Sequence, residues 1–162
     1  MVRWCKLFGE QYLGFWILGL VLFALQEVPY MIMPLFKLES NPIMNMPESS
    51  VLLDICEKVF GVLCIAVMTF IVQGQAGFFH IGNGINRIGF ISAVIVLLLN
   101  YLGWWLYFNG YQSIGIMMFF IVLLPPLYYV SIGIWRQNLI LVVVGIFFEV
   151  VHCIHVYGNL KI

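Results

Sequence analysis

The hydrophobic pattern divides the chain into five long apolar stretches separated by polar connections. They cover residues 12–32, 51–72, 88–108, 114–135 and 139–156. A helix needs about 20 apolar residues to cross roughly 30 Å of hydrocarbon, and open strands cannot satisfy their backbone groups in lipid. The pattern therefore predicts an all-α integral membrane protein, a single domain over residues 1–162 built as a bundle of five transmembrane helices.

The second stretch is the weakest of the five. Its uninterrupted apolar part, residues 59–72, holds only 14 residues. Extending the helix back to residue 51 adds Asp54, Glu57 and Lys58, which we place at the level of the lipid headgroups. If this helix only grazes the membrane, the bundle has four crossings.

The distribution of basic residues among the connections favours one orientation. With five spans, four basic residues share the side of the N-terminus and three lie on the other side. They are Arg3, Lys6, Arg87 and Arg136 against Lys37, Lys58 and Lys161. Cytoplasmic connections carry the excess of Lys and Arg. The sequence thus predicts a multi-pass protein with a cytoplasmic N-terminus, in what we take to be a bacterial plasma membrane.

Composition supports the membrane class and excludes others. The chain is 64% hydrophobic and only 9% charged, whereas soluble domains have about 25% charged residues. The net charge is zero, so there is no electrostatic case for nucleic-acid binding. The four cysteines form no Cys-x-x-Cys pair, which leaves neither a thiol-redox motif nor a zinc site supported. The identity of any cofactor stays open.

Polar side chains interrupt three of the predicted spans. Glu27 lies in the first, Asn100 in the third, and Glu149 and His152 in the fifth. An ionisable group inside a span costs about 2.5–3.5 kcal/mol, which makes its presence a functional hypothesis. At about 1.5 Å of rise per residue, these four lie roughly 15–22 Å from the inner ends of their spans. We therefore expect one polar layer between the membrane centre and its outer half.

The fourth span adds a break at the same depth. Pro125 and Pro126 lie near its middle, and proline removes the donor for the carbonyl four residues earlier. The carbonyls of Ile121 and Val122 should therefore be free, and Tyr128, Tyr129 and Ser131 follow closely enough to satisfy them. Interrupted helices are tolerated where they line a cavity, and in transporters they mark the binding site.

Small residues predict where helices approach closely. In the third span, Gly89 and Ala93 lie four residues apart, and Gly14 and Gly19 fall in the first span. Such positions let helix backbones meet in a membrane.

The Glu149-x-x-His152 pair is open to three interpretations. It could bind a proton or cation, it could hold a metal with Glu27 as third ligand, or it could only tie the bundle together by hydrogen bonds. Glu27 could also reach outward to the headgroups, and Asn100 could serve as an interhelical donor. We assign no catalytic residue and no metal ligand.

The sequence favours a ligand-binding or transport-type membrane protein. Its polar pocket would take a cation, a proton or an amine-bearing apolar molecule, with aromatic rings packing on the apolar part. The expected lining is Glu27, Asn100, Trp104, Tyr128, Glu149 and His152.

Two other functions remain. In the first, the chain is an accessory or immunity-type subunit whose polar groups face another membrane protein. In the second, it is an intramembrane enzyme acting on lipid, with Glu149 and His152 as acid and base. Polar groups that converge inward favour the pocket, whereas polar groups that face lipid favour a partner protein.

Overall fold

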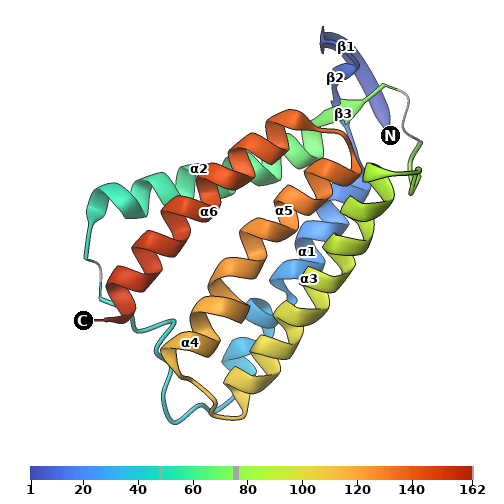
Figure 1. Ribbon diagram of the computed structural model, residues 1–162. Helices are drawn as coiled ribbons and strands as arrows, with labels where there is room; N and C mark the ends of the chain where they lie inside the picture. The colour runs from blue at the N-terminus through green and yellow to red at the C-terminus, as the bar shows by residue number, and fades with distance from the viewer. Residues whose placement is uncertain (48, 75–76, 162) are drawn as a thin grey trace.

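The chain forms a bundle of helices with a small β-sheet at one end, as seen in a computed structural model (Figure 1). The structure describes residues 1–47, 49–74 and 77–161. In chain order the elements are β1 (Val2–Phe8), β2 (Gln11–Phe15), α1 (Ile17–Ile32), α2 (Val51–Phe70), β3 (Ile71–Gln73), α3 (Ile85–Phe108), α4 (Ile114–Ile116), α5 (Leu124–Trp135) and α6 (Leu139–Leu160). A 3₁₀ turn, Met33–Leu35, extends α1, and a π-helical segment, Met117–Leu123, joins α4 to α5.

The helices run between two ends of the bundle. One end carries the sheet, and we call it the sheet end; the opposite end, with the segment after α1, the connection from α3 to α4 and the C-terminus, is the loop end (Figure 1). α5 packs between α3 and α6, α2 lies antiparallel along α6, and α1 contacts α2. The chain therefore brings α1, α2, α5 and α6 around a common space.

Within the described residues, four helical segments are long and apolar enough to cross a membrane. They are Ile17–Leu35, Ile85–Phe108, Ile114–Trp135 and Leu139–Leu160. α2 has 20 residues but carries Asp54, Glu57 and Lys58 in its first half. The structure thus fits a multi-pass membrane protein.

The N-terminal sheet was not predicted. Residues 12–15, expected at the start of a transmembrane helix, belong to β2 and pair with β1 and β3 in an antiparallel sheet of order β1-β2-β3. Gly9 has a positive φ of 51° and provides the left-handed backbone that a two-residue hairpin turn requires. The all-α prediction was therefore wrong for this segment, because the turn between β1 and β2 lets the strands pair locally.

Two prolines inside helices free carbonyl groups that side chains of α3 satisfy. Pro29 in α1 cannot donate to the carbonyl of Leu25, and the Tyr101 hydroxyl donates to that oxygen instead. In the π-helical segment, hydrogen bonds join residues five apart. Pro125 has no N–H and cannot donate to the carbonyl of Phe120. Nδ2 of Asn100 donates to this carbonyl at 2.8 Å.

Small residues allow α3 to lie directly on α5. A Cβ atom added at Gly89 would come within 2.4 Å of the backbone nitrogen of Trp135, and one at Gly103 within 2.1 Å of Cβ of Phe120. Ala93 is buried on the same helix. The close approach expected from Gly89 and Ala93 is therefore observed between α3 and α5.

The sheet end is closed by tryptophans around a buried arginine. The guanidinium of Arg136 lies 4.5 Å from the ring centroid of Trp16 and 5.8 Å from that of Trp135. It also donates to the carbonyl of Gly77 at 3.3 Å. Burial lowers the pKa of Arg136 to about 10, which is still far above neutral, so the side chain stays charged and cation–π contact holds it.

Candidate functional site

A pocket of about 170 Å³ lies between α1, α2, α5 and α6. Its wall joins three polar side chains to several aromatic rings. The polar residues are Gln26, Glu27 and His152, and the aromatic ones are Phe23, Tyr30, Tyr129 and Phe148. A concave, mostly apolar site with few convergent polar groups is the usual form of a small-molecule site.

The pocket has polar atoms that the described residues leave without a partner. Among the residues the structure describes, Glu27 forms no ion pair or hydrogen bond, and Oε1 of Gln26 is buried without a hydrogen bond. Tyr30 lies within electrostatic range of both Glu27 and Glu57. The α1 wall of the pocket therefore offers a carboxylate that no basic side chain of the described chain pairs with.

A carboxylate of α2 joins the two histidines of α6 beside the pocket. Oε2 of Glu57 contacts Nδ1 of His155, and Oε1 lies 3.1 Å from Nδ1 of His152. The second pair is close enough for an ion pair, but Nδ1 of His152 has no aligned hydrogen bond. Both imidazoles are largely buried, with 13% of the His152 and 6% of the His155 side chain exposed. We call Glu57, His152 and His155 the carboxylate–histidine cluster.

Hydrogen bonds beyond the cluster fix the tautomer of His155. The backbone N–H of Ser49 donates to Oδ1 of Asn159 at 3.0 Å, so Nδ2 of Asn159 is the atom that donates to Nε2 of His155, at 3.1 Å. Because Nε2 accepts, the neutral imidazole carries its proton on Nδ1. That proton points to Glu57, and the cluster is therefore held in a defined protonation pattern.

The remaining residues expected in the site lie elsewhere. Asn100 serves the carbonyl of Phe120, as described above, and the Tyr128 hydroxyl donates to the carbonyl of Leu22 at 3.3 Å. Trp104 is buried behind the pocket, with its ring 4.5 Å from that of Tyr30. These side chains hold the helices that form the pocket and do not line it.

Glu149 forms no hydrogen bond or ion pair with its expected partner, His152, among the described residues. It accepts a hydrogen bond from Sγ of Cys153 at 3.2 Å, and its Oε2 is buried without a hydrogen bond among the described residues. His152 faces Glu57 instead. Of the six residues expected to form the site, Glu27 and His152 are the two that the structure brings to the pocket.

Sequence reasoning missed four residues that now matter: Gln26, Tyr30, Glu57 and Tyr129. Glu57 was expected at the headgroup level, and that expectation did not indicate that its side chain faces the histidines of α6. Tyr129 replaces Tyr128 because the π-helical segment rotates the following residues relative to a regular α-helix. Two histidines three residues apart on an apolar helix were the available signal that a carboxylate had to face them.

Metal binding finds no support in this arrangement. Within the described residues, no group of three or more His, Cys, Asp or Glu side chains is placed to hold a metal ion. Nδ1 of His155 carries a proton toward Glu57, and a metal ligand nitrogen must be unprotonated.

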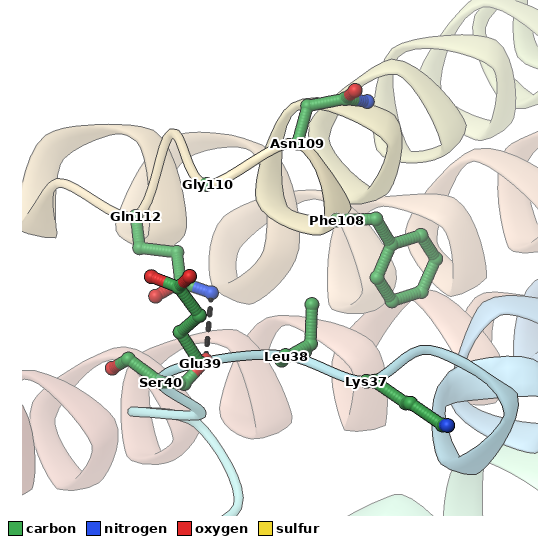
Figure 2. Close-up of a pocket in the computed structure, with 8 residues that line it drawn as sticks. All are labelled: Lys37, Leu38, Glu39, Ser40, Phe108, Asn109, Gly110 and Gln112. Atoms are coloured by element: carbon green, nitrogen blue, oxygen red, sulfur yellow. Dashed lines mark hydrogen bonds between the residues drawn. The ribbon is translucent and has the colours of Figure 1, made fainter.

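A larger groove of about 400 Å³ lies at the loop end, between residues 37–40 and the connection from α3 to α4 (Figure 2). Lys37 and Glu39 are exposed and point to opposite ends of the segment (Figure 2). Nε2 of Gln112 bridges the two connections by donating to the carbonyl of Ser40 at 3.0 Å. The groove is a gap between hydrated loops, and its charged groups do not converge on a ligand.

Comparisons with protein-family models, with curated proteins and with solved structures gave no match for this chain. The proposal for its function therefore rests on the geometry of the pocket.

Proposed function

We propose that this chain is a multi-pass membrane protein that binds a small organic cation, an ammonium with a short apolar tail, in the pocket between α1, α2, α5 and α6. The observation that carries the proposal is Glu27, a carboxylate on the pocket wall with no ionic partner among the described residues. An unpaired charge inside an apolar bundle is costly. A bound ammonium would offset that cost, which a neutral ligand cannot do.

The rest of the wall suits the same ligand. Tyr30, Tyr129 and Phe148 border the pocket, and aromatic rings can attract cations while also packing on apolar groups. Gln26, whose side chain also lines the pocket, adds a polar group beside Glu27. A volume of about 170 Å³ lies below the usual range for drug-sized ligands, so we infer a small amine.

We further infer that α2 crosses the membrane as a fifth span. It lies antiparallel along α6, which is long and apolar enough to cross, and has nearly the same length. The sheet end would then face the cytoplasm, because that end carries four basic residues: Arg3 and Lys6 in β1, Arg87 in the first turn of α3, and Arg136 just after α5. The pocket would lie in the outer half of the bilayer.

The proposal is tested by comparing n-butylamine with butan-1-ol, which has the same tail but no charge. The purified chain in lipid nanodiscs is unfolded by heat with each compound present. At a concentration about tenfold above its dissociation constant, butylammonium should stabilise the fold by about 1.4 kcal/mol, which raises Tm by about 3 °C for a chain of this size.

Two variants sharpen this test. Glu27→Gln should abolish the Tm shift, since it keeps the shape of the side chain and removes its charge. Glu39→Gln is the matched control, an exposed glutamate of the loop-end groove, and should respond like the unchanged chain. An equal shift with butan-1-ol, or a full shift in Glu27→Gln, would contradict the proposal.

A further inference from the structure

His152 has two roles in the geometry of the bundle. It lines the pocket together with Glu27, and its Nδ1 atom lies 3.1 Å from Glu57 in the carboxylate–histidine cluster. A change of charge in the cluster therefore changes the electrostatic potential in the pocket. Histidine is the side chain whose charge changes between pH 5 and 8.

We propose that the carboxylate–histidine cluster takes up a proton when the pocket releases its cation, so that the chain exchanges protons against the organic cation. This inference rests on the proposed function, because it concerns the same pocket. No covalent bond is formed or broken in the exchange. One proton enters the cluster from water, and one ammonium leaves.

Charge counting gives the direction of the coupling. With Glu57 ionised and both histidines neutral, the cluster carries one negative charge, which adds to the charge of Glu27 and favours a cation. One added proton neutralises the cluster, and a second makes it positive. Glu57 lies next to both histidines, so each proton that the cluster takes up makes the pocket less attractive to an ammonium.

Other ionisable groups lie next to the cluster on its own two helices. On α2, Asp54 is engaged with Lys58 at 2.7 Å. On α6, Glu149 lies within electrostatic range of His152 and holds Cys153 by a hydrogen bond. These pairs flank the cluster on its own helices.

The facing helices contribute one further acid. On α1, Glu27 and Tyr30 face the pocket, and Tyr30 lies in electrostatic range of Glu57. On α5, Tyr129 borders the pocket. Since tyrosine stays neutral in this pH range, Glu27 is the facing group whose own protonation has to be separated from that of the cluster.

A chain of contacts connects the cluster to the loop end. Exposed Ser49, just before α2, donates to Asn159, which donates to His155, which faces Glu57. His155 lies about 8 Å from the last residue of α6 along the helix axis. The cluster therefore extends from near the loop end to the pocket wall, where His152 lies.

The experiment measures the dissociation constant of n-butylammonium between pH 5 and 8, with the full chain in nanodiscs. A primary alkylammonium titrates near pH 10, as lysine does, so the charge of the ligand is constant over this range. If one proton is taken up for each cation released, the dissociation constant should rise by up to about tenfold for each unit by which the pH is lowered.

Glu57→Gln is the decisive variant, with Asp54→Asn on the same helix as the matched control. Glu57→Gln should still bind butylammonium at pH 8 but should lose the pH dependence, whereas Asp54→Asn should keep it. His152→Phe, which preserves a ring at the pocket wall, should also bind without pH dependence and serves if Glu57→Gln does not fold.

Each outcome has one meaning. Binding that is independent of pH in the unchanged chain overturns the inference. A pH dependence that persists in Glu57→Gln and His152→Phe also overturns it, because another acid such as Glu27 or Glu149 would then take up the proton. Absence of butylammonium binding at every pH overturns the proposed function, and the exchange with it.

Discussion

Glu57 on α2 contacts Nδ1 of His155 on α6, across 98 residues of sequence. The contact joins the loop-end half of two antiparallel helices by a buried, charge-assisted hydrogen bond. Such bonds are stronger than neutral ones, and removing one partner leaves the other unsatisfied at a cost of about 1–3 kcal/mol. The groups that hold His155 in place should therefore have measurable effects on stability.

Replacing Asn159 by alanine should lower the free energy of unfolding by about 1–3 kcal/mol. The substitution leaves Nε2 of His155 and the N–H of Ser49 without their partner. Thermal unfolding in nanodiscs measures the change. Asn83→Ala, at an exposed asparagine, should change the stability by no more than about 0.5 kcal/mol. Equal effects of the two substitutions would show that Asn159 does not organise the cluster.

Asn100 should prove structural and not part of the ligand site. Asn100→Ala removes the donor for the carbonyl of Phe120 and should destabilise the fold by about 1–2 kcal/mol. The affinity for butylammonium should be unchanged at a temperature where the variant is folded. Asn109→Ala, at the exposed residue that follows α3, is the control. A loss of binding in Asn100→Ala would place this residue in the pocket after all.

The contact of α3 with α5 should tolerate no added methyl group at Gly89. In Gly89→Ala the new Cβ atom would lie 2.4 Å from the backbone nitrogen of Trp135, so the helices must separate, at about 1–3 kcal/mol. Gly115→Ala has no atom within 4 Å of the new Cβ and should be neutral or stabilising by up to about 1 kcal/mol. Thermal unfolding of the two variants measures the difference in stability. A larger loss of stability in Gly115→Ala than in Gly89→Ala would contradict this packing of α3 on α5.

Replacing the buried Arg136 at the sheet end should lower the stability of the fold. Arg136→Gln loses the cation–π contact with Trp16 and weakens the contact with Gly77, so Tm should fall by an amount equivalent to about 1–3 kcal/mol. The Tm of Arg136→Lys should lie between those of the unchanged chain and Arg136→Gln, because an ammonium keeps the charge but lacks the planar guanidinium group. Exposed Arg87 provides the control, and Arg87→Gln should leave Tm nearly unchanged.

The helices could be predicted because lipid imposes a simple rule. A stretch such as residues 114–135 must satisfy its backbone internally, so even Pro125 and Pro126 did not divide it. The hairpin was harder, because β2 continues directly into apolar residues of α1 and its strand character depends on pairing with β1. Local hydrophobicity alone does not report such pairing.

The site was predictable only in part, because the sequence indicates how deep a residue lies along its span but not toward which neighbouring helix its side chain points. Depth along the spans placed Glu27 and His152 in one layer, and both line the pocket. The same depth placed Asn100 there, although its side chain faces Phe120. The direction in which a side chain points depends on the π-helical segment and on how α2 packs against α6. The spacing of polar residues in the sequence predicts neither of these features.

The measurement that tests the central proposal most directly is a distance between the bound cation and Glu27. Solid-state NMR of the chain in bilayers, with ¹³C-labelled glutamate and ¹⁵N-labelled n-butylamine, detects dipolar coupling between a side-chain carboxyl carbon and the ammonium nitrogen. The account predicts coupling to Glu27 at about 4 Å, as in an ion pair, and its loss in Glu27→Gln. Coupling that persists in Glu27→Gln, or an ammonium that contacts no glutamate, would contradict it.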